Sequence, residues 1–234
     1  MHFRDQEKMK AITLSFDDGI TQDIRLIELL NLYGLKCTFN LNSGLLGQKG
    51  MLNREGQRIA HYKVHPEDVK EIYEGHEVAV HTLTHPILTK QNESEIIRQV
   101  EQDRLALSAL VDYEVVGMAY PGGGVNHNET VARIIAEHTG VRYARTTLCT
   151  DSFDPQTDLY RFQPNVHILN FERLMDLGCQ FIALETKVPQ IFYIWGHAYE
   201  MDCQSDYWVK LEEFFRLISN KNDIFYGTNR EVLL

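Results

Sequence analysis

Acidic and imidazole side chains stand at three separated points of the chain, each just after a short apolar run: Asp17 with Asp18, His81 with His85, and His197. The two histidines of HTLTH are spaced so that both imidazoles can point the same way, as a zinc ion requires. One carboxylate and two imidazoles supply three ligands and leave coordination positions open for water and a substrate oxygen. That pattern marks a catalytic rather than a structural metal site. A second carboxylate can then act as a base and a further histidine as an acid.

Each of these motifs, taken alone, has a plainer interpretation. Asp-Asp-Gly after a strand is usually a turn, because Asp and Gly are favoured turn residues. The two histidines of HTLTH are about as often surface residues near a turn, and His197 alone is more often a hydrogen-bonded core histidine. The combination of motifs, each at the end of an apolar run, favours the metal site.

The elements that must position these residues alternate between short apolar runs and amphipathic patterns. Predicted strands cover residues 11–16, 36–41, 77–80, 115–120, 141–144, 190–195 and 224–226. The first predicted helix begins near Thr21 and ends near Gly34. Further predicted helices cover residues 66–73, 93–111, 128–138, 171–184 and 207–218. We expect residues 42–65 to form a long functional loop and residues 151–164 to be irregular.

The repeated strand-then-helix order has no break in composition, so we expect residues 1–234 to form a single α/β domain with a mainly parallel sheet. About seven such units suit a barrel, closed or incomplete, better than a short open sheet. Functional loops of such folds follow the carboxyl ends of the strands. The loops that carry these motifs, together with Pro121-Gly122-Gly123 at the end of a further strand, should therefore meet at one cavity.

The charge balance limits the partners. Acidic residues outnumber basic ones by 33 to 23, and the net charge of −10 disfavours both nucleic acid and an anionic membrane surface. No apolar run has the length of a membrane span, and MHFRDQEKMK lacks the apolar stretch of a secretion signal. We expect a cytoplasmic protein as written, with a removed leader left open. The sequence does not indicate an oligomeric state.

Four motifs together resemble the polysaccharide deacetylase family, also called the NodB homology domain or carbohydrate esterase family 4. They are LSFDDG (14–19), HTLTH (81–85), AYPGG (119–123) and IWGH (194–197), and the first two together are highly specific. The resemblance implies a distorted (β/α) barrel and a metal-dependent hydrolase that removes N-acetyl or O-acetyl groups from a carbohydrate. It also implies that Asp18, His81 and His85 hold a divalent metal, usually zinc, with cobalt, manganese or nickel as alternatives.

The same resemblance assigns three further roles. Asp17 is the implied general base, His197 the implied general acid, and the backbone amide of Gly122 the implied donor to the oxyanion. Adjacent residues of an extended strand point to opposite sides. A turn at Gly19 must therefore bend the chain if both aspartates are to reach one cavity.

The chain departs from the family pattern at two places. The third motif usually carries an arginine, which orients the catalytic aspartate, where this chain has Ala119. Arg145 and Arg161 are candidates to replace it. The carboxylate that usually tunes the acidic histidine is also not identifiable, although three aspartates lie in the right stretch: Asp151, Asp154 and Asp158. Glu200 is a further candidate to bond to His197 or to the substrate.

Three aromatic residues near the motifs are candidates for a wall against a sugar face: Tyr120, Trp195 and Tyr199. Ordinary packing is the plainer explanation for them. The expected partner is an acetylated sugar or oligosaccharide.

Other activities compete with this one. A hydrolase of a small amide or cyclic imide on the same barrel is one alternative, and an inactive, metal-binding carbohydrate module is another. The presence of both Asp17 and His197 argues against the inactive module, because binding alone needs neither a base nor an acid. A non-haem iron oxygenase also uses two histidines and a carboxylate, but the β-rich framework expected for it is not seen.

Overall fold

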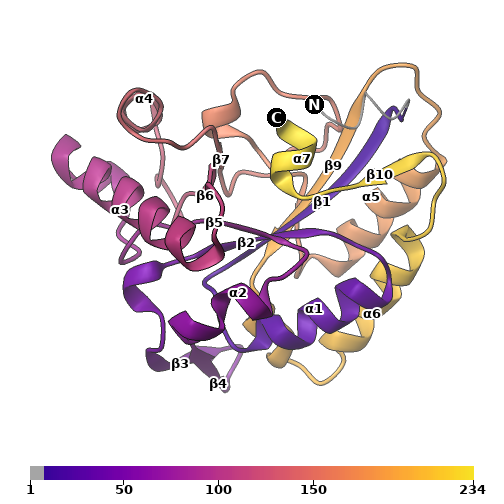
Figure 1. The fold of residues 1–234 in the computed structure, drawn as a ribbon. Helices are drawn as coiled ribbons and strands as arrows, with labels where there is room; N and C mark the ends of the chain where they lie inside the picture. Colours follow the sequence, from indigo (N-terminus) through magenta and orange to yellow (C-terminus); the bar gives the residue numbers. More distant parts are fainter. Residues whose placement is uncertain (1–7) are drawn as a thin grey trace.

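The computed structural model describes residues 8–234 and places eight strands in one sheet (Figure 1). Most of the N-terminal stretch used for the prediction of location lies outside the described residues. The strands are β1 (Lys10–Asp17), β2 (Cys37–Leu41), β5 (Glu77–Val80), β6 (Gly117–Ala119), β7 (Tyr143–Arg145), β8 (Val166–His167), β9 (Gln190–Gly196) and β10 (Ile224–Tyr226). Their order is β7-β6-β5-β2-β1-β9-β8, with β10 pairing to β1 off this path.

All neighbouring strands of this sheet are parallel. The sheet curls into a half-barrel, and one short segment spans much of the gap between its edges. Phe162 bridges Arg145 of β7, and β8, a few residues further on, pairs with Ile194 and Trp195 of β9. The predicted distorted (β/α) barrel is therefore confirmed.

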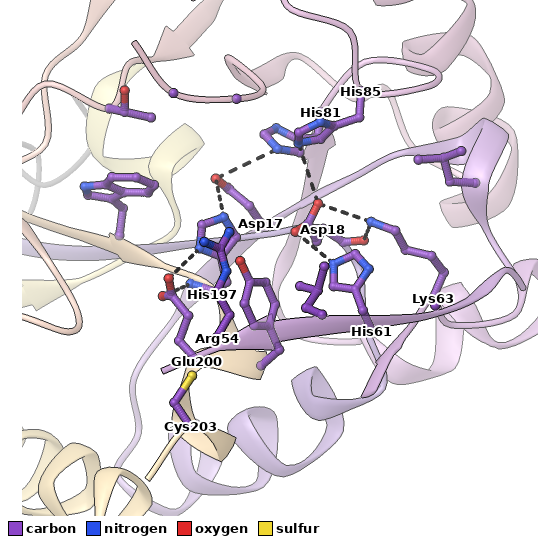
Figure 2. Close-up of a pocket in the computed structure, with 18 of the residues that line it drawn as sticks. Asp17, Asp18, Arg54, His61, Lys63, His81, His85, His197, Glu200 and Cys203 are labelled. Atoms are coloured by element: carbon purple, nitrogen blue, oxygen red, sulfur yellow. Dashed lines mark hydrogen bonds and ion pairs between the residues drawn. The ribbon is translucent and has the colours of Figure 1, made fainter. Parts of the chain in front are cut away.

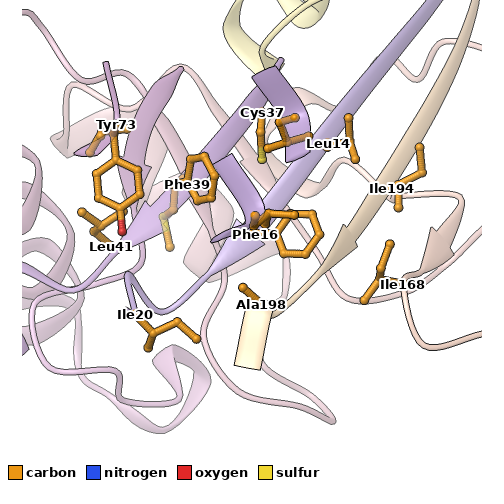
Figure 3. Close-up of a cluster of buried hydrophobic side chains, with 14 of the residues drawn as sticks. Leu14, Phe16, Ile20, Cys37, Phe39, Leu41, Tyr73, Ile168, Ile194 and Ala198 are labelled. Atoms are coloured by element: carbon orange, nitrogen blue, oxygen red, sulfur yellow. The ribbon is translucent and has the colours of Figure 1, made fainter. Parts of the chain in front are cut away.

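Strand β1 shows how the sequence builds this sheet. It is buried along its whole length, as expected for a strand with parallel neighbours and helices packed outside. Ile12, Leu14 and Phe16 alternate with polar residues and join the main hydrophobic core, part of which Figure 3 shows with Phe39 and Ile194. The alternate residues, which include Thr13, bond to polar groups inside the barrel. This alternation sends Asp17 to the interior.

Seven helices cover the sheet in the described residues, and several of them begin at a side-chain cap. They are α1 (Gln22–Leu32), α2 (Val69–Ile72), α3 (Glu93–Val111), α4 (Glu129–His138), α5 (Phe171–Ala183), α6 (Tyr207–Ile218) and α7 (Asn229–Leu233). Asn92, Asn128 and Asn170 each accept a hydrogen bond from a backbone N–H in the first turn of α3, α4 and α5. Among the described residues, no helix combines the length and apolarity needed to cross a bilayer.

The segment predicted as a long loop holds an antiparallel hairpin, so that part of the prediction is wrong. Strands β3 (Lys49–Arg54) and β4 (Gln57–Tyr62) are joined by Glu55 and Gly56, both with positive φ. Two central residues with positive φ are the mark of a tight hairpin turn. Most side chains of the hairpin are exposed, so it carries no apolar alternation that would have predicted strands.

Two smaller elements were also not predicted. Strand β8 has only two residues, too short for any periodic pattern. Helix α7 begins at a capping box in which Thr228 and Glu231 bond to each other's backbone, and this spacing is a signal that the sequence does contain. Figure 1 shows the hairpin at the bottom of the view and α7 in its upper half.

Candidate active site

The motif residues converge on one cavity of about 780 Å³ where β1, β5 and β9 end (Figure 2). Its lining includes ten of the residues singled out from the sequence: Asp17, Asp18, His81, His85, Tyr120, Gly122, Trp195, His197, Tyr199 and Glu200. The hairpin and the residue that follows it supply another wall, with Lys49, Leu52, Arg54, Glu55, His61 and Lys63. The predicted meeting of separated loops is therefore present in the structure.

Asp17 ends β1 inside the barrel and is held by two neighbours. Asn40, its register partner on β2, donates to Oδ1 at 2.8 Å. Arg145 Nη2 lies 2.5 Å from both carboxylate oxygens, and its guanidinium stacks 4.6 Å from the Trp195 ring centroid. Burial alone would raise the pKa of Asp17, but the Arg145 charge lowers it below the ordinary value. Asp17 is therefore a fixed, ionised carboxylate.

Arg145 occupies the place left by the missing arginine of the third motif. Ala119 on β6 is the register partner of Arg145 on β7, so the neighbouring strand brings a guanidinium to Asp17 from beside Ala119. Arg161, the other candidate, bonds to Asp158 instead, and its side chain is 34% exposed. The suggestion of Arg161 for this position is wrong.

Asp18 reaches the cavity because the chain bends at Asp18 itself. Its φ is +87°, followed by +59° at Gly19, so the bend starts one residue earlier than predicted. A side chain at Gly19 would place its Cβ 2.7 Å from Leu41 Cγ, which explains the glycine after the aspartate pair. The left-handed backbone breaks the strand alternation and lets both carboxylates face one space.

The Asp18 carboxylate lies between the histidines of the second motif and the end of the hairpin. Its Oδ1 is 3.8 Å from His85 Nε2 and 3.2 Å from Lys63 Nζ, and its Oδ2 is 3.1 Å from His61 Nε2. Lys63 also donates to the Asp18 carbonyl at 2.6 Å. Burial would raise the pKa of Asp18, but His61 and Lys63 hold it well below the ordinary value.

Asp18, His81 and His85 form a donor set that fits a divalent metal, since their ligand atoms all lie within 4.8 Å of one another. His81 Nδ1 lies 2.9 Å from the Ala119 carbonyl oxygen. A carbonyl can only accept, so Nδ1 carries the proton and Nε2 keeps its lone pair. Burial lowers the pKa of His81 to about 4, which keeps the ring neutral near pH 7. Neutral imidazole is the form that binds a metal.

His197 stands on the other side of Asp17 and is paired with Glu200. Its Nε2 is 4.0 Å from Asp17 Oδ2, and its Nδ1 is 3.2 Å from Glu200 Oε1. The alignment of Nδ1 is too poor for a hydrogen bond, so the contact is an ion pair. Burial would lower the pKa of His197, but the Glu200 carboxylate raises it to about 9. His197 therefore carries a proton near pH 7.

The three aspartates suggested as partners of His197 are elsewhere, so that suggestion is wrong. Asp151 pairs with Arg173, Asp154 bonds to Ser152 and Gln190, and Asp158 pairs with Arg161. Glu200 was the alternative, and the structure puts it against the ring. It lies only three residues after His197, in a short 3-10 helix (Ala198–Asp202) that His197 caps. The backbone N–H of His197 donates to Glu200 Oε2 at 3.0 Å.

Three residues near the motif side chains were not found from the sequence: His61, Lys63 and His167. Lys63 is buried and donates to Asp18 and to Asn42 Oδ1. His167 on β8 has its Nε2 3.4 Å from Glu200 Oε2 and its ring against Trp195. None of them belongs to a motif. The only signal for His61 and Lys63 was the general one that long loops are often functional, and His167 had no signal.

Gly122 has φ +74° and lines the cavity. Its carbonyl accepts a hydrogen bond from Asn126 Nδ2 at 2.6 Å, while its N–H finds no partner within residues 8–234. A side chain here would place its Cβ 3.2 Å from Ile87. The glycine therefore lets a backbone donor sit open at the cavity wall.

The aromatic wall is present but mostly buried. Tyr120, Trp195 and Tyr199 are 0%, 9% and 3% exposed, and Tyr120 donates its hydroxyl hydrogen to the Tyr160 carbonyl. Trp195 packs on Arg145, and the Tyr199 ring lies 5.0 Å from that of His197. Each therefore shapes the cavity, with little of its own surface exposed.

A family model described as polysaccharide deacetylase matches residues 4–144. The matched range is more than half of the chain and contains both aspartates, His81, His85 and Gly122. It ends just before Arg145, so the residues that tune Asp17 and His197 lie beyond it.

Among curated proteins, the chain is similar to the peptidoglycan-N-acetylglucosamine deacetylase PgdA of Listeria monocytogenes. The two are 27% identical over 147 residues, which are 62% of this chain and 27% of the Listeria protein. This chain therefore spans about a quarter of the length of the curated relatives it matches.

Solved structures with the same fold include a candidate polysaccharide deacetylase from Mycobacterium smegmatis, with a TM-score of 0.68, 16% identity, and coverage of 97% of this chain and 89% of that one. A family 4 carbohydrate esterase from Streptomyces lividans gives a TM-score of 0.57 and 14% identity, with coverage of 94% of this chain and 93% of that one. A family 4 pseudoenzyme from Bacillus anthracis gives a TM-score of 0.54 and 16% identity, with coverage of 96% of this chain and 66% of that one. Identities this low establish the fold only.

Proposed function

The chain belongs to the polysaccharide deacetylase family, and on that premise we propose that it is a metal-dependent hydrolase that removes N-acetyl or O-acetyl groups from a carbohydrate. The observation that carries the proposal is the position of Asp17. Its Oδ2 lies 4.0 Å from His81 Nε2 in the metal-capable cluster and 4.0 Å from His197 Nε2 on the other side. A carboxylate between a cation site and a protonated imidazole is what acyl hydrolysis needs.

Asp18, His81 and His85 are the residues that would hold the metal. A divalent ion bound there would polarise the acyl carbonyl and lower the pKa of a water molecule. Zinc suits two imidazoles and one carboxylate. His61 and Lys63 hold the Asp18 carboxylate from the hairpin side, so its direction is set before an ion binds.

Asp17 would act as the general base, accepting the proton of the attacking water. Arg145 and Asn40 both bond to its Oδ1, and Arg145 also reaches Oδ2, the oxygen that faces the two histidines. The guanidinium keeps Asp17 ionised, at the expense of some basicity because it lowers the pKa. Its benefit is a fixed direction, which a general base requires.

His197 would act as the general acid, giving its proton to the leaving nitrogen or oxygen. Glu200 keeps it charged near pH 7, and Asp17 lies within reach to receive or return a proton through water. The open N–H of Gly122 would donate to the developing oxyanion. Such a donor contributes about 3–4 kcal/mol to the transition state.

The presence of a pseudoenzyme among the proteins of this fold makes activity a separate question from fold. Here both a base and an acid stand beside the metal-capable cluster, and each has its own buried, charged partner. A binding module needs neither. This arrangement favours an enzyme.

The test is acetate release from acetylated chito-oligosaccharides by purified protein. We expect release that stops on chelation and returns when zinc or cobalt is added. Asp17→Asn is the matched variant, since it keeps all three metal ligands. Release that is unaffected by chelation, or that Asp17→Asn leaves unchanged, would contradict the proposal.

A further inference from the structure

We propose that the substrate carries an anionic substituent, a carboxylate or a phosphate, and that Arg54 and Lys49 of the hairpin bind it. This inference rests on the proposed function, because it names a class of acylated sugar for the same cavity. It comes from the charge of the hairpin, the pairing of the cavity carboxylates and the place of Arg54.

The hairpin is a basic segment in an acidic protein. Residues 49–63 contain four cationic side chains and one acidic one, so their net charge is +3. The whole chain carries −10, which leaves −13 for all other residues. A strongly acidic body repels anions in general. A basic strip placed at the cavity therefore selects for a negative charge at that place alone.

The cavity carboxylates already have partners. Arg145 pairs with Asp17, Lys63 with Asp18, and His197 with Glu200. The fourth, Glu55, is exposed and bonds through Oε2 to Gln204 and Tyr207, at 3.0 and 3.2 Å.

Two cations on the cavity wall remain without a carboxylate. Within residues 8–234, neither Lys49 nor Arg54 makes an ion pair. Counting Glu55 against them, the unpaired charge of this wall is +1, before any metal is bound. A negative group on the substrate is the complement of that wall.

Arg54 is directed at the chemistry rather than at solvent alone. Its side chain is exposed but lines the cavity close to Tyr199, and the Tyr199 ring packs between His61 at 5.3 Å and His197 at 5.0 Å. Arg54, His197 and Glu200 all line the cavity drawn in Figure 2. Lys49 lines the same cavity, with its ammonium 5.8 Å from the Tyr62 ring centroid. Both cations therefore line the cavity in which the proposed chemistry takes place.

The chemistry of the two side chains fits this role. A guanidinium offers a planar fork that matches a carboxylate or a phosphate, and a lysine adds a point charge. A cavity of about 780 Å³ has room for an acylated sugar with such a group attached. A hydrogen bond to a charged group changes binding by about tenfold or more.

The experiment compares four probes on zinc-loaded protein: N-acetylglucosamine, its 6-phosphate, its 1-phosphate and N-acetylmuramic acid. Acetate release gives kcat/KM, and equilibrium dialysis gives binding without turnover. We expect at least one anionic probe to exceed N-acetylglucosamine by about tenfold or more. Arg54→Gln with Lys49→Gln should bring that ratio close to one. The phosphate and carboxylate probes separate the two sources of charge.

Arg58→Gln is the matched control, because Arg58 lies on the same hairpin but not on the cavity wall. It should leave the ratio unchanged. Equal kcat/KM for neutral and anionic probes, or an equal loss of the ratio in Arg58→Gln, would overturn the inference. Selective binding of an anionic probe that depends on Arg54, without acetate release from any probe, would support this site while removing the proposed function.

Discussion

Two clusters, each of two histidines and one carboxylate, lie on either side of Asp17. One contains Asp18, His81 and His85, the other His167, His197 and Glu200, and in each the ligand atoms lie within 4.8 Å of one another. In the first, a backbone carbonyl accepts a hydrogen bond from Nδ1–H of His81, and burial keeps the ring neutral. In the second, a carboxylate faces Nδ1 of His197, and the ring is charged.

The comparison shows that the partner of the second ring nitrogen sets the role of a histidine. A carbonyl behind a buried imidazole leaves a neutral ligand, whereas a carboxylate behind it leaves a proton donor. Residue types and clustering alone do not separate these roles. The group that faces Nδ1 does, and it comes from a different strand or turn in each case.

The largest expected effect falls on Asp17, which the two clusters share. Asp17→Asn should lower kcat by about 10²–10⁴-fold, the usual contribution of a general base. Zinc affinity should change little, because Asp17 is not among the proposed ligands. Zinc titration and acetate release, measured on the same preparation, check both. Asp18→Asn is the paired variant and should lose the metal. If the two variants behave alike, the division of roles between the adjacent aspartates is wrong.

Arg145→Met should destabilise the fold strongly. It leaves the buried Asp17 carboxylate without its cation, and breaking a buried pair this way costs about 3–5 kcal/mol. Denaturant unfolding measures the change. Arg161→Met is the control, since its partly exposed pair with Asp158 should contribute about 1 kcal/mol or less. Equal losses in the two variants would mean that Arg145 has no special place behind the base.

His61→Ala tests the hairpin side of the metal cluster. Removing a side chain that orients a ligating carboxylate typically weakens metal binding by about 10–100-fold, and His61 is bonded to Asp18 Oδ2. Competition with a chelating dye would measure zinc affinity. His65→Ala, an exposed histidine just beyond the hairpin, should change nothing. Unchanged affinity in His61→Ala would place the hairpin outside metal binding.

Glu200→Gln should give the smallest effect at pH 7 and the clearest pH signature. The raised pKa of His197 keeps the acid protonated below about 9, so activity should fall as the pH rises through that value. Without the carboxylate, the alkaline limb of the pH–rate profile should move down towards the ordinary histidine pKa near 6.5. Activity at pH 7 should then fall by about fourfold. The acidic limb should stay in place. A pH–rate profile for both proteins decides this, and an unmoved alkaline limb would remove Glu200 from the tuning of the acid.

The parts of the site that could be predicted were those with a local pattern. HTLTH and Asp-Asp-Gly follow apolar runs, and parallel strands bring such ends together, so the metal-capable cluster and Asp17 were within reach of the sequence. Glu200 was within reach too, because it lies one short turn after His197.

The sequence does not predict which residues become neighbours across strands. Arg145 was one of two arginines until the register placed it beside Ala119. The hairpin that supplies His61 and leads to Lys63 has no apolar alternation, because it packs against no core on most of its surface. Its turn uses Glu-Gly rather than the stronger Asn-Gly or Asp-Gly signal.

The most direct test of the account is a crystal structure of zinc-soaked protein with anomalous data at the zinc edge, because two clusters compete for the ion. We predict one strong peak, bound by Asp18, His81 Nε2 and His85, with His197 still paired to Glu200. A peak held by His167, His197 and Glu200 instead, with the Asp18 cluster bound only to His61 and Lys63, would contradict the account.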